Sequence, residues 1–261
     1  MPRIANQHLL YDTAMATAQC GMAEDQVDAV VEGLTVLHLK FPTDSKALYI
    51  MTRDFSELAN RMAQKLLATA PDSAEAMGLL AETYQAQGKL EEATNKYRMI
   101  LEKYPNQPNV HYQLARILMA KPLDPVTAEA ARKELEEELK VNPTSPAAEF
   151  MLGDIAWREQ KIDDAIAHFT RATQFDVGLA EPYLGLGIAL NAAGKYTDAI
   201  KTLHKYVELQ PANPAGYYQL MLAYNRIGNK EEAARMMALQ QEAQKKWNQG
   251  PTTSMDMQQP H

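Results

Sequence analysis

Cysteine and glycine are scarce in this chain of 261 residues, which contains 1 Cys and 12 Gly. One cysteine cannot form an internal disulfide or supply a cysteine-built zinc site. Runs of Val, Ile and Thr of the kind that form strands are nearly absent, whereas Ala, Glu, Gln, Leu and Met, which favour helices, are frequent. Because 46% of the residues are hydrophobic, the chain can bury a core. The composition therefore predicts an all-α protein.

Basic residues do not cluster in the sequence. The formal net charge is -7, and the nearest approach to a basic patch, Lys245-Lys246, is expected to end a helix. Duplex binding needs grouped Lys and Arg side chains that neutralise phosphates, so we expect no nucleic-acid partner. No run of 18 apolar residues occurs, so we expect no transmembrane helix and no membrane insertion.

The single cysteine, Cys20, bears on the compartment. Residues 17–20 distantly resemble a bacterial lipoprotein cleavage box, but Gln19 stands directly before the cysteine, where such a signal has a small residue. The favoured interpretation is a buried cysteine on a helix. A chain without cystines fits a reducing cytoplasm, and a periplasmic location stays an alternative if an export signal has been removed.

Turns centred on Gly88, Gly194 and Gly228 indicate internal repetition. The last two glycines lie 34 residues apart, and Gln160 occupies the same place a further 34 residues upstream. Frames of this length open at Ala74, Pro146, Ala180 and Pro214, and an irregular frame opens at Pro108. A fixed period of this length indicates a repeat array.

The regular frames follow, with departures, one order of residue types: large, Leu, small and aromatic, then Ala and aromatic, then Pro. Val177 replaces the proline in the frame at Pro146, and the last frame has no proline. The positions are Met77, Leu80, Ala81, Tyr84, Ala93, Tyr97 and Pro105; Glu149, Leu152, Gly153, Ala156, Ala165, Phe169 and Val177; Tyr183, Leu186, Gly187, Leu190, Ala199, Leu203 and Pro211; and Tyr217, Leu220, Met221, Tyr224, Ala233 and Met237. This order resembles the tetratricopeptide repeat family. The resemblance implies an all-α, right-handed superhelical solenoid of helix-turn-helix repeats that binds peptides or protein elements in a concave groove lined by first helices.

Physical reasons support the pattern. The large residues form one apolar stripe on the first helix of each pair. The small residue in that stripe, such as Gly187, is expected to let the second helix approach, with its alanine, such as Ala199, meeting it there. The turn glycine tolerates a positive φ, and the proline ends the second helix.

The frame predicts the organisation of the whole chain. Residues 1–10 are expected to be a loose lead-in, 11–73 degenerate repeat-like helices, 74–107 a repeat, 108–145 a repeat with a four-residue insertion, 146–179 and 180–213 repeats, 214–248 a repeat with a capping helix, and 249–261 a disordered tail. In the insertion, Asp124 is expected to cap a helix that has Pro125 at its first position.

Residues 45–70 admit two interpretations. One apolar stripe through Met51, Phe55, Leu58 and Met62 allows a single long helix. Asp54 with Glu57 resembles a capping box, which favours a tight pair of helices.

Frame positions 2, 5, 9 and 12 of each first helix lie away from the packed stripe and should be polar unless they bind something. Across neighbouring repeats many are instead apolar or aromatic, which marks an interaction surface. The predicted partner-binding residues are Tyr112, Arg116, Phe150, Asp154, Trp157, Leu184, Ile188, Asn191, Tyr218, Leu222 and Asn225. The alternative is that some of them, Leu184 and Ile188 foremost, pack against a neighbouring repeat.

Within the family, repeats that bind Hsp70 or Hsp90 hold a terminal carboxylate with Lys and Asn at set first-helix positions. The corresponding places here carry Gly78 and Glu82, Tyr112 and Arg116, or Phe150 and Asp154, so that clamp is missing. An amphipathic helix or extended segment with apolar anchors is the expected ligand.

Catalytic motifs are not found. HExxH, GxSxG and a phosphate-binding glycine loop do not occur, so we expect no catalytic residue, no metal site and no cofactor. Asp164 and His168 have a spacing that could hold a metal, but a solvated charge pair on one helix is favoured.

The sequence thus predicts a non-catalytic scaffold or adaptor that binds a protein or peptide. A structural subunit of a stable complex, perhaps at an envelope, is the second hypothesis, and a regulator of a separate enzyme is the third. Neither the oligomeric state nor the identity of the partner follows from the residues.

Overall fold

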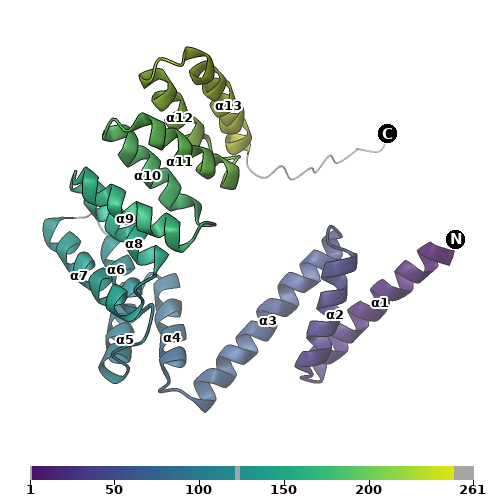
Figure 1. Cartoon of the computed structure of the whole chain (residues 1–261). Helices are drawn as coiled ribbons and strands as arrows, with labels where there is room; N and C mark the ends of the chain where they lie inside the picture. Colours follow the sequence, from purple (N-terminus) through teal and green to yellow (C-terminus); the bar gives the residue numbers. More distant parts are fainter. Residues whose placement is uncertain (1, 121–123, 250–261) are drawn as a thin grey trace. The chain divides into compact units, whose positions relative to one another are not determined.

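The computed structural model describes residues 2–120 and 124–249, and within them it contains thirteen helices and no strand (Figure 1). The helices are α1 (Pro2–Ala23), α2 (Val27–Lys40), α3 (Ser45–Thr69), α4 (Ala74–Ala86), α5 (Leu90–Lys103), α6 (Val110–Met119), α7 (Pro125–Val141), α8 (Pro146–Arg158), α9 (Ile162–Phe175), α10 (Ala180–Ala192), α11 (Tyr196–Leu209), α12 (Pro214–Arg226) and α13 (Lys230–Gln249). The expected all-α class is confirmed. The chain forms two compact units, and the boundary between them along the sequence falls between Lys96 and Tyr97, inside α5.

The first unit is organised around the packing of α1 on α2. Gly33 of α2 faces the backbone of α1 so closely that an added Cβ would lie 2.6 Å from the carbonyl oxygen of Ala14. Val30, Leu34 and Leu37 of α2 are buried, together with Ala47, Ile50 and Met51 of α3, in one core cluster. These side chains hold α1, α2 and the first half of α3 together.

Two expectations for this unit are wrong. The predicted loose lead-in is helical from Pro2, because α1 extends over residues 2–23. The tight pair of helices within residues 45–70 is a single helix, α3, because neither proline nor glycine interrupts it. Asp54 is buried in the middle of α3 and pairs with Arg53, while Glu57 pairs with Arg61, so no capping box forms.

Cys20 lies on α1 but is exposed, which contradicts the expected buried cysteine. Ala14, Met15 and Ala18 supply the buried face of this helix. Cys20 follows Ala18 by about half a helical turn and therefore lies on a different face.

In the second unit the helix starts follow local capping chemistry. Ser145 accepts a hydrogen bond from the backbone N–H of Ala148, and Asn213 accepts one from Ala215, at the N-termini of α8 and α12. Asp124 accepts from Val126 and Thr127 with Pro125 at the first helical position, so the predicted cap of α7 is confirmed. Side-chain acceptors thereby satisfy N–H groups that lack partners within the helix. The predicted disordered tail lies outside the described residues.

The turns within helix pairs use left-handed backbone. Gly88, Gly194 and Gly228 have φ of 74°, 73° and 81°, and Gln160 takes the same role at 60°, as the frame predicts. At Gln160 the N–H groups of residues 160 and 161 donate to the carbonyls of Trp157 and Ala156 at 3.0 and 2.9 Å. This pairing is the Schellman arrangement that ends a helix and turns the chain back.

The irregular repeat obtains its cap from a different helix. Asn109, before α6, has a φ of 72° and makes no side-chain cap. Glu138 of α7, 1% exposed, instead accepts hydrogen bonds from the backbone N–H groups of Asn109 at 2.8 Å and Tyr112 at 3.4 Å. A buried carboxylate thus fixes α7 against the N-terminus of α6.

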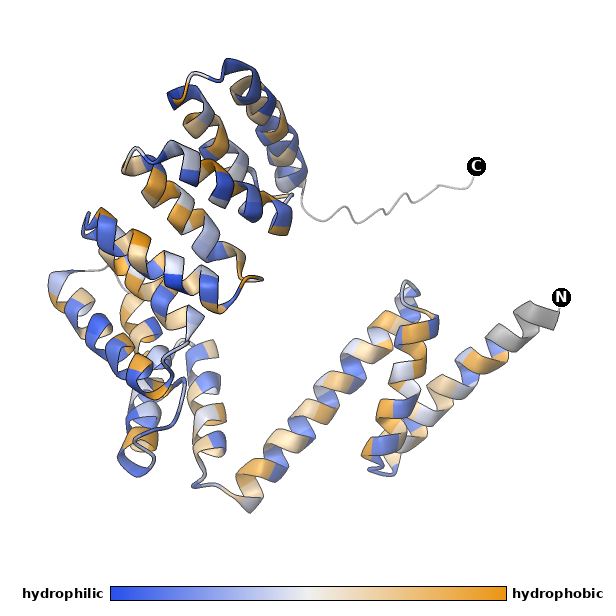
Figure 2. Ribbon diagram, in the orientation of Figure 1, coloured by the Kyte–Doolittle hydropathy of each residue, from blue (hydrophilic) through white to orange (hydrophobic). Residues whose placement is uncertain are grey.

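From α8 to α13 each helix packs on the next, and the first helices α8, α10 and α12 also contact one another in sequence. One core cluster extends from Ala156 through Phe169, Leu190 and Leu203 to Met236. Figure 2 shows apolar residues along most of α10, which has neighbours on several sides, whereas α13 is largely polar. Stacking of neighbouring pairs supplies the core that one pair lacks.

The small residues on the first helices face a different side chain from the one expected. An added Cβ at Gly153 would overlap the ring of Phe169, and one at Gly187 would overlap Leu203. We expected alanine of the second helix to meet these glycines. The atoms nearest to each glycine belong instead to the large residue four positions after that alanine.

A buried carboxylate also ties α8 to α9. Glu149, 4% exposed, accepts from Nδ1 of His168 and from Nε of Arg171, each at 2.6 Å. Burial opposes ionisation, but the hydrogen bonds from His168 and Arg171 outweigh it and hold the pKa of Glu149 below its usual value. His168 therefore pairs with Glu149 rather than with the exposed Asp164, contrary to expectation.

Replacing Gly187 by alanine is expected to destabilise the protein by about 1–3 kcal/mol, because the added methyl group overlaps Leu203. Gly78→Ala is the matched control, since Gly78 also lies within a helix but has open space at the Cβ position. That change should be neutral or stabilise by up to about 1 kcal/mol. Urea unfolding followed by circular dichroism measures both, and an equal effect of the two substitutions would contradict close approach at Gly187.

Glu149→Gln is expected to lower stability by about 2 kcal/mol at pH 7, since it removes a charged hydrogen-bond acceptor from a buried site. Because folding lowers the pKa of Glu149, its ionised form stabilises the protein fully above the usual value of 4.5. This stabilisation is lost as the pH falls from there through the lowered pKa. Urea unfolding at pH 7 and pH 3 should show that the difference in unfolding free energy between wild type and variant shrinks at the lower pH. The exposed control Glu208→Gln should differ little from wild type at either pH. A difference of constant size would contradict the assignment.

Candidate functional site

The first helices α8, α10 and α12 line two clefts in the second unit. The first cleft has a volume of about 290 Å³ and the second about 250 Å³. Trp157 and Ile188 line both, so the two clefts are neighbours along the layer of first helices.

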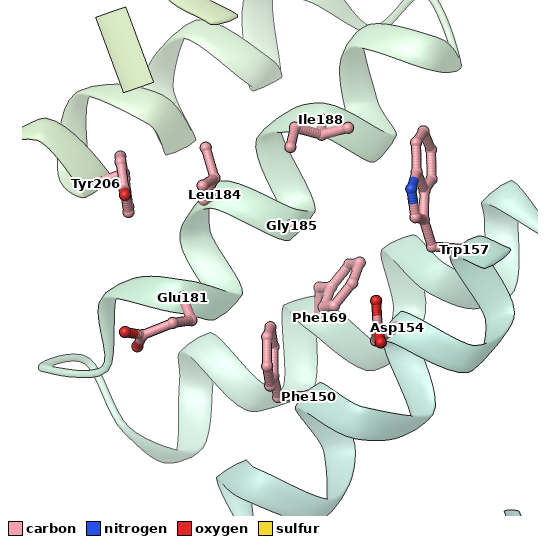
Figure 3. Close-up of a pocket in the computed structure, with 9 residues that line it drawn as sticks. All are labelled: Phe150, Asp154, Trp157, Phe169, Glu181, Leu184, Gly185, Ile188 and Tyr206. Carbon is pink, nitrogen blue, oxygen red and sulfur yellow. The ribbon is translucent and has the colours of Figure 1, made fainter. Parts of the chain in front are cut away.

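The first cleft lies between α8 and α10, with contributions from α9 and α11. Figure 3 shows Phe150, Asp154 and Trp157 projecting from α8 on one side and Leu184 and Ile188 from α10 on the other. The residues that line it are Phe150, Asp154, Trp157, Phe169, Glu181, Leu184, Gly185, Ile188 and Tyr206. All but Asp154, Glu181 and the hydroxyl of Tyr206 are apolar, so most of the lining offers apolar contact to a ligand.

Close packing shapes the floor of this cleft. The rings of Phe150 and Phe169 have centroids 5.8 Å apart and are tilted by 42°. Phe169 reaches the cleft because Gly185 has no side chain. A Cβ added to Gly185 would lie 2.8 Å from Cζ of Phe169. A larger residue at Gly185 would displace the ring and fill the cleft.

Two carboxylates give the first cleft a negative rim. Asp154 pairs with Arg158, one turn along α8, at 3.0 Å. Glu181 is exposed and makes neither a hydrogen bond nor an ion pair within the part of the chain that the structure describes. Tyr206 is 3% exposed; burial, and then the charge of Glu181, raise the pKa of its hydroxyl. The hydroxyl therefore stays protonated and can donate a hydrogen bond.

The second cleft is more polar. Its lining consists of Trp157, Ile188, Asn191, Ala192, Tyr196, Gln219, Leu222 and Arg226. Nδ2 of Asn191 donates to the backbone oxygen of Gln219 at 3.1 Å and to its side-chain oxygen at 3.2 Å. Asn191 thus joins α10 to α12, while Leu222 is 37% exposed and open to a ligand.

The structure brings most of the predicted groove residues together. Those that line a cleft are Phe150, Asp154, Trp157, Leu184, Ile188, Asn191 and Leu222. The rest do not: Tyr112 packs against the core cluster of α6, α7 and α8, Arg116 is exposed on α6, and Tyr218 and Asn225 are exposed on α12. Phe150, Trp157 and Leu184 both line a cleft and pack against the core, so packing and exposure are not exclusive alternatives. Their contact with a partner stays a prediction.

Sequence reasoning missed the residues that second helices contribute. Phe169 of α9 and Tyr206 of α11 line the first cleft, and Tyr196 of α11 lines the second. The predicted groove contained only first-helix positions. A signal was present for Tyr206, because the same frame position in the preceding repeat is Ala172, where a large polar aromatic residue is not needed for packing.

Metal ligands and membrane spans were sought among residues 2–120 and 124–249. No group of three or more His, Cys, Asp or Glu side chains there is arranged to hold a metal ion. In the same part of the chain, no helix combines the length and the apolar character that crossing a bilayer requires.

Two curated proteins illustrate the sequence similarity. The TPR repeat-containing protein YpiA of Bacillus subtilis is 23% identical over 229 residues, which cover 86% of this chain and 53% of YpiA. Hsp70-Hsp90 organizing protein 2 of Arabidopsis thaliana is 26% identical over 132 residues, 51% of this chain and 22% of that protein. The chain spans about half, or less, of the length of these relatives.

Solved structures share the fold. A crystal structure of MamA superposes with a TM-score of 0.58 at 21% identity, covering 68% of this chain and 95% of MamA. YrrB, described as a TPR protein with an unusual peptide-binding site, superposes with a TM-score of 0.58 at 18% identity, covering 70% of this chain and 92% of YrrB.

Family models agree with these similarities. One tetratricopeptide repeat model matches residues 57–117, and a second matches residues 128–177 and 184–250. The helix pairs, their left-handed turns and these matches lead to one conclusion: the chain belongs to the tetratricopeptide repeat family.

Proposed function

We propose that this protein is an interaction scaffold whose two neighbouring clefts bind a segment of a partner protein. The observation that supports this function is that Trp157 and Ile188 line both clefts, which gives a ligand a path from one cleft to the next. A ligand that follows this path contacts three first helices in succession. The fold shared with YrrB, whose own description includes a peptide-binding site, favours the same use of the layer here.

The lining indicates a ligand with apolar anchors. Trp157, Leu184 and Ile188 stand half-buried, so a bound side chain would remove their remaining surface from water. Apolar surface buried in this way contributes about 25 cal/mol per Å² to the favourable free energy of binding. Anchors of this kind occur at regular spacing on an amphipathic helix or on alternate residues of an extended segment.

A terminal carboxylate is a poorer candidate for the bound group. The positions that would form the family's basic clamp carry Phe150 and Asp154 in the repeat that lines the first cleft. Asp154 would repel a carboxylate, and the phenyl ring of Phe150 offers it no hydrogen bond.

A structural subunit of a stable complex is the second candidate. The first unit exposes several large apolar side chains on α3, namely Leu48, Tyr49, Phe55 and Met62. A contact through this surface would not use the clefts. A regulator of an enzyme would be a scaffold whose partner happens to be catalytic, and the same clefts would serve it.

Trp157→Ala combined with Leu222→Ala is expected to reduce recovery of the partner from an extract of the source cells by about tenfold or more, since central aromatic anchors carry most binding energy. Trp247→Ala with Met237→Ala is the matched control, because both side chains are exposed but line neither cleft. Quantitative mass spectrometry of the captured proteins, with circular dichroism to check folding, makes the comparison. Equal recovery by the two double variants would exclude the clefts as the binding site.

A further inference from the structure

We propose that the first cleft accepts a lysine or arginine side chain, so that the partner segment carries a basic residue next to its apolar anchors. This inference rests on the proposed function and specifies its ligand. The cleft combines two carboxylates, the hydroxyl of the buried residue Tyr206 and aromatic rings, and no cationic residue lines it.

Charge complementarity is the first argument. Asp154 stands on α8 and Glu181 on α10, so the two carboxylates flank the cleft from different helices (Figure 3). Arg158 occupies one side of Asp154 but does not line the cleft, and Glu181 has neither a hydrogen bond nor an ion pair among the described residues. A cation inside the cleft would therefore interact with two negative charges that the fold leaves available to it.

Tyr206 provides an independent argument. Its side chain is 97% withdrawn from solvent, lines the cleft, and has no hydrogen-bond partner among the described residues. The hydroxyl oxygen is not among the buried atoms without a partner, so water can reach it and a ligand in the cleft can bond it. Because its pKa is raised, the hydroxyl can donate to a ligand's backbone carbonyl, and its oxygen can accept from an ammonium or guanidinium group.

The apolar walls match the rest of such a side chain. Lys and Arg lay their methylene stems along apolar surface while the charged end seeks polar partners. Leu184 and Ile188 form a wall for the stem, and the rings of Phe150 and Trp157 border the cleft (Figure 3). An aromatic face also attracts a cation directly.

Other ligand types fit less well. An acidic side chain would meet the repulsion of Asp154 and Glu181, and a wholly apolar one would remove these carboxylates from water without replacing their hydrogen bonds. The second cleft has Arg226 in its lining, so a basic residue is favoured only at the first cleft. The charge difference between the two clefts then sets the direction in which the segment binds.

Selection from a phage-displayed library of random 16-residue peptides tests the inference, with the full chain as bait. Peptides enriched on wild type should contain Lys or Arg beside apolar residues. When the Asp154→Asn, Glu181→Gln double variant is the bait, the selected peptides should contain fewer basic residues than those selected on wild type. Their preference for apolar residues should persist. The control, Asp198→Asn with Glu208→Gln, removes two exposed carboxylates outside the clefts and should change nothing.

Fluorescence anisotropy of one selected peptide gives the magnitude. The double variant in the cleft should bind it about three- to tenfold more weakly, and replacing the peptide's basic residue by norleucine should have a similar effect on wild type but little on that variant. Added salt should weaken peptide binding to wild type more than peptide binding to the double variant.

The outcomes separate the two proposals. Enriched peptides that have apolar anchors but no basic residue, or that are acidic, would overturn the basic-ligand inference and leave the groove function standing. If no peptide is enriched over the Trp157→Ala, Leu222→Ala variant, the groove function itself fails.

Discussion

The close approach of two helices within each pair is the constraint on which the rest of the second unit depends. In the pairs α8–α9 and α10–α11 it depends on a first-helix residue without a side chain, Gly153 or Gly187, and on a large residue opposite, Phe169 or Leu203. Short turns with left-handed backbone then bring the second helix back at the right height. Once the pairs have this shape, their first helices stack side by side, and the stack can present a continuous surface to a ligand.

The same packing rule creates the candidate site. Phe169 fills the space that Gly153 leaves within its own pair, and the absence of a side chain at Gly185 allows the ring to reach the cleft between α8 and α10. One aromatic ring therefore serves both the core and the binding surface. Trp157 and Leu184 have the same double role. Substitutions at such positions affect stability and binding together, which is why matched exposed controls are needed to separate the two effects.

Features set by neighbours in sequence could be predicted, whereas those set by partners across helices could not. Residue 160 could be assigned to a left-handed turn because of its place in the frame, and Asp124 to a cap because Pro125 follows it. Glu138 and Glu149 gave no such signal, since their partners lie 19 to 29 residues away in sequence. The first-helix lining of the clefts could be predicted from the frame, whereas Phe169 could not, because it reaches the cleft only through the missing side chain of Gly185 on another helix. The sequence left one long helix and a tight pair open for residues 45–70, because Asp54 with Glu57 resembles a capping box although no proline or glycine breaks the segment.

Site-specific photocrosslinking tests the central claim most directly, because it reports contact and not affinity. Benzoylphenylalanine placed at Leu222, in the second cleft, should form a covalent adduct with the partner in an extract of the source cells. The same group at Met237, which is 50% exposed outside both clefts, should not. Adduct at Leu222 alone is the result that the groove account predicts. Adduct at Met237 without any at Leu222 would contradict it.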